Sequence, residues 1–221
     1  MRDAAHSLRN YLDWRRVFEL DRLGTPLHSA MRDVLHSQCV RLTGARDRSG
    51  RPILHVFASL VPPSSCVEDV VRTVHWLAEC AMRTWPECQL EGIAVLLDCT
   101  GTESAAVTTR LLHLGQQVIA RLKYIPVGVA VLLGLNLGKR MEPAWVVLAD
   151  AMPPTTEVRA VCAQSSAECV GVLEPFISEA QLLADHGGSF EFSHDDWCQR
   201  VDATMCDEEW PWPTERPTEE R

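Results

Sequence analysis

Two uninterrupted apolar segments, separated by a helix-length segment, constrain the fold of this 221-residue chain more than any other feature. The first runs over residues 92–98 and the second over residues 127–136, with a helical segment ending at Lys123 between them. Strands that are apolar at every position are typical of parallel sheets covered by helices on both faces. The stretch therefore predicts an α/β fold, with a mostly parallel β-sheet flanked by helices.

Strand and helix signals on both sides extend this alternation. They predict a strand over residues 52–60, a helix over 65–85, a strand over 157–163 and a helix over 165–173. Both helices begin with a Ser-x-x-Glu capping box, in which each side chain binds the other residue's backbone N–H. The chain thus alternates strands and helices across its central part, as an α/β domain requires.

The ends of the chain differ in character from this central part. Residues 1–45 are expected to form a short helical N-terminal segment, and residues 46–200 the α/β domain. Residues 201–221 are acidic and rich in proline, a composition that buries too little apolar surface to fold, and are expected to be a disordered tail.

Charge and cysteine usage limit the classes of partner and compartment. A formal net charge of −9 argues against broad nucleic-acid binding, which depends on neutralising phosphates. No apolar signal region opens the chain and no run reaches the ~18 apolar residues that span a bilayer. The nine cysteines contain no C-x-x-C pair. We expect a reduced, cytoplasmic protein that makes at most transient, peripheral contact with membranes.

No motif predicts catalysis or metal binding. The run from Cys66 to Arg72 has the C-x5-R spacing of a phosphatase loop, but it carries two acidic residues that would repel phosphate. The run 134–140 is one residue short of a P-loop and lacks its Ser/Thr. Three histidines could join Asp195 and Asp196 as metal ligands, but solvated surface positions are the favoured interpretation for His113, His186 and His194. We expect a protein that is not an enzyme and has no metal or cofactor other than a lipid ligand.

The segment 141–152 is apolar on nearly every side, which points either to a buried core helix or to a cover over an apolar cavity. Prolines at positions 143, 153 and 154 give it defined ends, as a hinged lid would need. Periodicity alone leaves both interpretations open.

Short motifs in the right order make residues 46–190 similar to the CRAL-TRIO family of lipid-binding domains. Asp47–Ile53 resembles the family's D-x-x-G-R-P-V, and 91–101 its second strand and turn. The remaining matches are Tyr124-Ile125-Pro126, Asn136 ten residues beyond that proline, Pro154–Arg159, and the closing Leu182–Gly188.

This resemblance implies an apolar cavity covered by a gate helix at residues 141–152. The cavity residues it implies are Val95, Leu97, Val131, Leu133, Leu135, Trp145 and Leu148, and the gate residues are Met141, Trp145, Val146, Leu148 and Met152. It also implies head-group contacts from Thr156 and Arg159. The Glu-Arg pair of phosphatidylinositol-binding members is replaced here by Val127 and Gly128. The expected function is non-enzymatic binding of a phospholipid or other hydrophobic small molecule, with its transfer between membranes or sensing as finer expectations.

A second interpretation comes from the passage between Pro52 and Ser64, which is similar to the divergent branch called BCH domains. That branch acts largely through protein contacts linked to small-GTPase signalling. The alternative is therefore a protein-interaction scaffold that binds a protein partner and no lipid.

Overall fold

The computed structural model describes residues 9, 11–13, 16, 29–102, 105–122, 127–163 and 165–204. Most of the predicted N-terminal helical segment, the Tyr124-Ile125-Pro126 motif and the tail from residue 205 onward lie outside the described residues.

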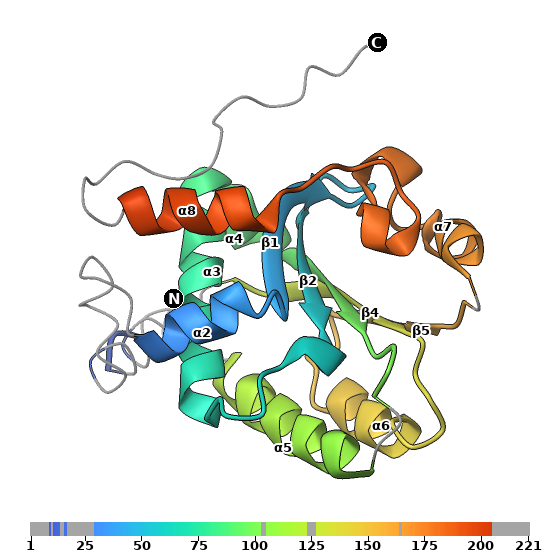
Figure 1. Cartoon of the computed structure of the whole chain (residues 1–221), viewed down its shortest axis with the longest axis horizontal. Helices are drawn as coiled ribbons and strands as arrows, with labels where there is room; N and C mark the ends of the chain where they lie inside the picture. Colours follow the sequence, from blue (N-terminus) through green and yellow to red (C-terminus); the bar gives the residue numbers. More distant parts are fainter. Residues whose placement is uncertain are drawn as a thin grey trace.

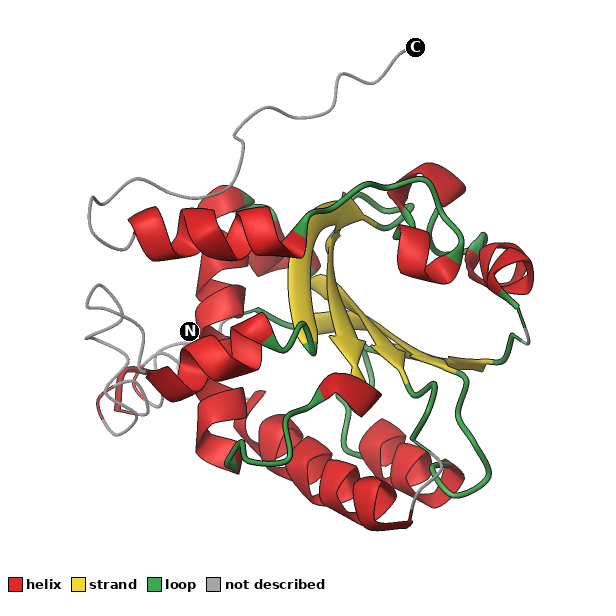
Figure 2. Ribbon diagram, in the orientation of Figure 1, coloured by secondary structure: helices red, strands yellow, loops and turns green. Residues whose placement is uncertain are grey.

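A five-stranded sheet forms the centre of the molecule, with strand order β1-β2-β3-β4-β5 (Figures 1 and 2). The strands are β1 (Val40–Arg46), β2 (Pro52–Phe57), β3 (Ile93–Asp98), β4 (Val129–Leu135) and β5 (Glu157–Val161). Only the β1–β2 pair is antiparallel, and the other three pairs are parallel. The predicted α/β fold with a mostly parallel sheet is confirmed.

Helices cover both faces of this sheet. The helical elements are α2 (Ser29–His36), η2 (Ala58–Leu60), α3 (Val67–Thr84), α4 (Cys88–Glu91), α5 (Ala105–Leu122), α6 (Glu142–Asp150), α7 (Ser166–Leu173), η3 (Glu179–Gln181), η4 (Ala184–His186) and α8 (His194–Thr204). Because the strand order follows the chain order, right-handed crossovers bring their helices α3, α5 and α6 to one face. The segment from α7 to η4 covers the opposite face (Figure 1).

The first strand, β1, was not predicted, so the sheet begins at Val40 rather than after the predicted boundary at residue 46. Its sequence contains two arginines and a glycine, which interrupt the apolar pattern expected of a buried strand. Arg41 is nevertheless buried, because its guanidinium pairs with Asp185 at 2.9 Å and lies 4.2 Å above the centre of the Phe57 ring. These partners are 144 and 16 residues away along the chain, so no local pattern could reveal them.

Helix α8 was not predicted either, and it runs past the boundary placed at residue 200. Its Trp197 is 1% exposed and packs against Trp76 of α3, with ring centres 6.4 Å apart. This aromatic contact anchors the helix on the same side of the sheet as α2 and α3.

The turn between β1 and β2 is organised by Asp47, a buried residue of the motif that resembled the family. Its Oδ1 accepts hydrogen bonds from the backbone N–H groups of Ser49 and Arg51, both at 2.9 Å. Its Oδ2 accepts from the Arg51 guanidinium at 2.7 Å. The Asp47 carboxylate therefore ties together the backbone of the turn between β1 and β2.

Replacing Asp47 with alanine is expected to lower the free energy of unfolding by about 2–4 kcal/mol, because three hydrogen bonds to a buried, charged acceptor are lost. Asp47→Asn is the matched control, since its amide oxygen can still accept the two backbone hydrogen bonds. Urea denaturation measures both variants. Equal stability of Asp47→Ala and the unaltered protein would contradict this role.

Candidate ligand-binding site

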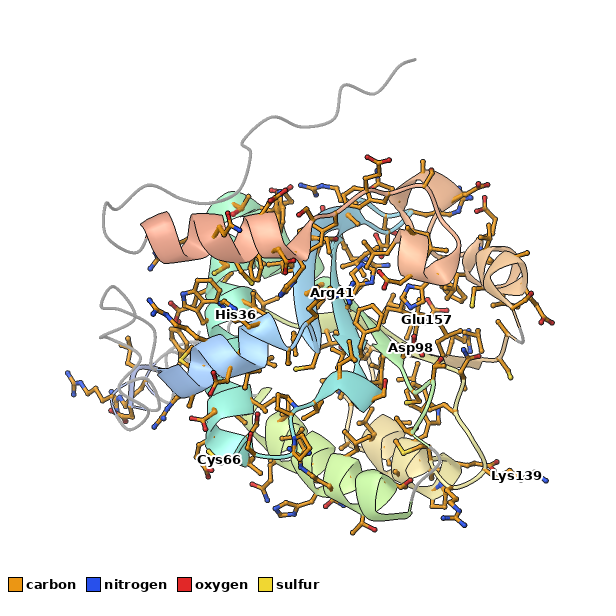
Figure 3. The ribbon with its side chains drawn as sticks, viewed as in Figure 1. His36, Arg41, Cys66, Asp98, Lys139 and Glu157 are labelled. Atoms are coloured by element: carbon orange, nitrogen blue, oxygen red, sulfur yellow. The ribbon has the colours of Figure 1, made fainter. Side chains whose placement is uncertain are left out.

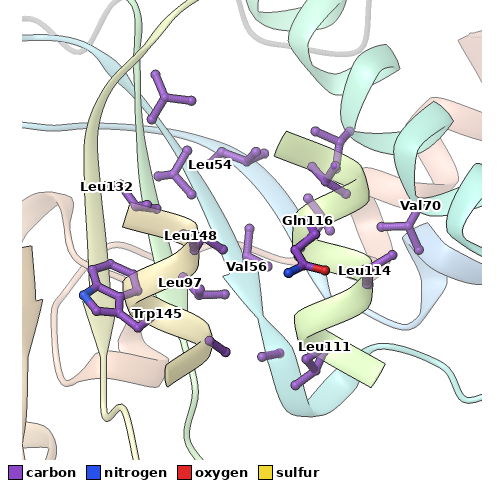
Figure 4. Close-up of a pocket in the computed structure, with 18 of the residues that line it drawn as sticks. Leu54, Val56, Val70, Leu97, Leu111, Leu114, Gln116, Leu132, Trp145 and Leu148 are labelled. Atoms are coloured by element: carbon purple, nitrogen blue, oxygen red, sulfur yellow. The ribbon is translucent and has the colours of Figure 1, made fainter. Parts of the chain in front are cut away.

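An apolar cavity of about 160 Å³ lies between the sheet and helices α3, α5 and α6 (Figure 4). Strand residues form its floor: Leu54, Val56, Val95, Leu97 and Leu132. Helix residues form its walls, and they include Val70, Val74, Leu111, Leu114, Trp145 and Leu148. Gln116 is the one polar side chain among the described lining residues.

Strand alternation decides which side chains reach this cavity. On β3, Val95 and Leu97 share the cavity face, and Leu132 does so on β4. Val131, Leu133 and Leu135 point to the opposite face, where they pack with the α7 segment in a separate core. The expectation that these three residues line the cavity is therefore corrected. The sequence could not show this, because every position of β4 is apolar and both faces of the sheet are covered.

Helix α6 closes one side of the cavity. Met141, Trp145, Leu148 and Met152 form a stripe that follows the helical period and lines the cavity. Val146 belongs to the predicted gate set but points the other way: it is 52% exposed, and its neighbour Val147 is 43% exposed. The helix is thus apolar both toward the cavity and toward solvent.

Two glycines shape the surfaces against which α6 packs. A Cβ atom at Gly134 of β4 would lie 2.6 Å from the Trp145 ring, so only glycine leaves room for the indole there. A Cβ atom at Gly115 of α5 would lie 3.3 Å from the Leu148 side chain. The helix is therefore held by close contacts that a single methyl group disturbs.

Replacing Gly134 with alanine is expected to displace Trp145 and loosen α6, lowering stability by about 1–3 kcal/mol through overpacking. Amide hydrogen exchange should become faster in residues 142–150 while the β-sheet core stays protected. Gly138→Ala is the matched control, because no atom lies within 4 Å of a Cβ placed there. Unchanged exchange in Gly134→Ala would show that the contact does not hold the helix.

Asn136 fixes the loop that leads from β4 into α6. It adopts a left-handed conformation with φ 57°, which asparagine tolerates better than most residues. Its amide nitrogen donates to the Thr100 hydroxyl and its amide oxygen accepts from the Ala163 N–H, both at 2.9 Å. These bonds tie the ends of β3 and β5 to the start of the loop before α6.

The two predicted head-group residues do not line the cavity. Thr156 is buried, and its hydroxyl donates to the Val129 carbonyl at 2.7 Å. The Arg159 side chain is 60% exposed and pairs with Glu157 at 3.1 Å. The structure brings neither residue to the cavity, so their role in head-group contact stays a prediction.

A polar cluster that the sequence did not reveal lies on the opposite face of the sheet. Asp98 lies at the carboxyl end of β3 (Figure 3), and its Oδ2 atom is 3.2 Å from the Nε2 atom of His186. Burial raises the pKa of Asp98, but hydrogen bonds from His186 and Thr100 outweigh it and hold the pKa below its ordinary value. His55 stacks on His186 with ring centres 6.1 Å apart. Burial lowers the pKa of His55 to about 3.

The favoured surface placement of the three histidines is correct only for His113, which is exposed. His186 and His194 are buried, and the Nε2 atom of His194 lies 2.6 Å from the Leu35 carbonyl oxygen. Among the described residues, no group of three or more His, Cys, Asp or Glu side chains is placed to hold a metal ion. In the same part of the chain, no helix combines the length and apolar character needed to cross a bilayer.

Comparison with known protein families assigns this fold to a family. Residues 35–188 match the family profile described as the CRAL/TRIO domain. The chain belongs to the CRAL/TRIO family. This match confirms the resemblance carried by the short motifs, includes β1 and ends before α8. No curated protein matches the chain.

Membership of the CRAL/TRIO family gives the general function. Its domains bind lipids or other small hydrophobic molecules and are in general ligand-binding or transfer proteins rather than enzymes. In this chain the cavity under α6 is the feature suited to such a ligand, because its described lining is apolar apart from Gln116.

Proposed function

We propose that this protein carries a hydrophobic small molecule in the cavity under α6, and that α6 is the gate through which the molecule enters and leaves. The observation that carries this proposal is that α6 is apolar on two faces. One face lines the cavity through Trp145 and Leu148, and the other presents Val146 and Val147 to solvent.

The size of the cavity supports a gate that moves. Ligand pockets usually have volumes of ~300–1,000 Å³, whereas a cavity of ~150 Å³ admits a molecule such as benzene. The cavity here, at about 160 Å³, is smaller than such pockets, as we expect if α6 can move outward to admit a larger ligand. Outward movement of α6 would withdraw Trp145 and Leu148 and enlarge it, and each CH₂ group buried there would contribute ~0.8 kcal/mol to binding.

The outer surface of α6 supports a transient membrane contact. Exposed valines on a short helix can insert at the boundary between head groups and acyl chains. Lys139 and Arg140, both exposed, come just before the helix and can approach anionic lipids despite the net charge of −9. A gate that opens in the membrane would exchange its ligand without exposing the cavity to water.

Native mass spectrometry of the purified protein, followed by lipid extraction, tests the carrier proposal. A discrete adduct of lipid-like mass is the expected result, either as purified or after incubation with mixed lipid vesicles. A protein that stays free of adducts after that incubation would contradict the proposal.

The small volume of the cavity also favours a second candidate, the BCH-like protein-interaction scaffold with a collapsed cavity. In that case a stable protein partner should bind equally well to the unaltered protein and to Leu97→Trp, whose larger side chain fills the cavity. Loss of the partner in Leu97→Trp, with the fold intact, would count against a scaffold that does not use the cavity.

A further inference from the structure

We propose that the ligand is an uncharged, hydrocarbon-rich molecule with at most one neutral hydrogen-bonding group, rather than a lipid with a buried phosphate head group. This inference rests on the carrier function proposed above and narrows the class of its ligand. It follows from the polar side chains that line the cavity, and from the hydrogen bonds and ion pairs that nearby arginines already make.

The described lining of the cavity contains no charged side chain, and Gln116 is its one polar side chain (Figure 4). An ion transferred into such surroundings loses its hydration and gains no partner, which is far less favourable than burying a neutral group. A phosphate drawn inside with its acyl chain would therefore weaken binding.

Among the described residues, no lysine or arginine belongs to the lining of the cavity. Arg110 comes just before the lining residues of α5, but its guanidinium donates to the backbone carbonyls of Val61, Pro62 and Ser65. Arg159 pairs with Glu157 on β5 and does not line the cavity. Lys139 projects away from the body of the molecule (Figure 3).

Gln116 has the properties needed to recognise one neutral polar group. It lines the cavity and is also exposed, so its amide lies where the cavity meets solvent. An amide can donate to and accept from a hydroxyl or a carbonyl oxygen. A molecule with its hydrocarbon part inside and a hydroxyl or carbonyl group at Gln116 would satisfy both environments.

Dodecan-1-ol and dodecyl phosphate form a matched pair of probes, because they have the same chain and differ only in the polar group. Binding of each to the full chain is measured by displacement of a fluorescent apolar probe, with dodecan-1-ol kept below its solubility limit and dodecyl phosphate below the concentration at which it forms micelles. We expect dodecan-1-ol to bind at least about 30-fold more tightly, since its hydroxyl is far easier to desolvate than a phosphate.

Two variants connect this difference to the cavity. Gln116→Leu should weaken binding of dodecan-1-ol about five-fold and leave dodecane unaffected, because a single neutral hydrogen bond is lost. Leu97→Trp should prevent binding of both dodecan-1-ol and dodecane by filling the cavity. Leu90→Trp is its control, because the same substitution there affects a side chain that is 94% exposed. Thermal unfolding establishes that each variant is folded.

The outcomes separate this inference from the carrier function. Equal or tighter binding of dodecyl phosphate overturns the inference and leaves the carrier function standing. Binding of dodecan-1-ol that persists in folded Leu97→Trp overturns the assignment to this cavity. Failure of dodecan-1-ol, dodecane and dodecyl phosphate alike to bind the unaltered protein removes the carrier function as well.

Discussion

Replacing Trp145 with aspartate is expected to abolish ligand uptake, reducing occupancy about 100-fold or more. The indole lines the cavity and packs on Gly134, so the substitution removes a large apolar wall. It also brings a carboxylate into a lining that has no described charged partner, where burial of the charge is strongly unfavourable. Native mass spectrometry after incubation with lipid vesicles measures the occupancy.

Two variants on the same helix serve as controls for this result. Trp145→Phe keeps an aromatic ring in the cavity wall and should retain most of the uptake. Val146→Asp places the same carboxylate on the outer face, at a residue that is 52% exposed. It should retain a ligand delivered in solution but slow transfer between vesicles. Full lipid occupancy in Trp145→Asp would refute the assignment of α6 as the gate.

Acidification from pH 7 to pH 4 is expected to destabilise the protein by about 3 kcal/mol through His55 alone. Burial is the main reason why the pKa of His55 is lowered to about 3, with the nearby His186 and Arg41 acting in the same direction. Because both ring nitrogens lack a hydrogen-bond partner in the structure, no acceptor favours the charged form. The unfolded chain takes up a proton near pH 6.5 while the folded chain resists it. Stability is therefore full above pH 6.5 and falls as the pH drops toward 3.

His55→Leu isolates this effect from other titrating groups. Burial also lowers the pKa of His194, so that residue adds to the acid sensitivity in the same direction. The lowered pKa of Asp98 contributes stability that is lost only as the pH falls below its ordinary value near 4. Urea denaturation at pH 7 and pH 4 measures the free energy of unfolding. The loss of this free energy between the two pH values should be smaller by about 3 kcal/mol in His55→Leu than in the unaltered protein. Equal losses in the two proteins would show that His55 does not resist protonation.

The alternation of apolar strands and helices was sufficient to predict the fold. The predicted cap at Ser165 is confirmed, because its side chain accepts a hydrogen bond from the Glu168 N–H. The predicted cap at Ser65 is wrong, because α3 begins after Cys66 without a side-chain cap. The helix at 65–85 and the strands around 93–98 and 129–135 were predicted because their patterns are local and each extends over one element. Strand β1 was missed because Arg41 is compensated by Asp185 and Phe57, which only the folded chain brings near it. The buried His55 and His186 were missed for the same reason: burial of a polar ring depends on contacts across the sheet.

The sequence by itself determined the layered α/β fold, the family and the position of α6 as an apolar helix after the Asn136 strand. Hydrophobic periodicity and short motifs carry this information, because both are properties of neighbouring residues. Only the tertiary structure decided that Leu132 faces the cavity while Val131 and Leu133 face the other core, and that Trp145 packs on Gly134. A strand buried on both faces has no polar side to mark its orientation. The partners of each side chain are therefore set by how separate elements pack together.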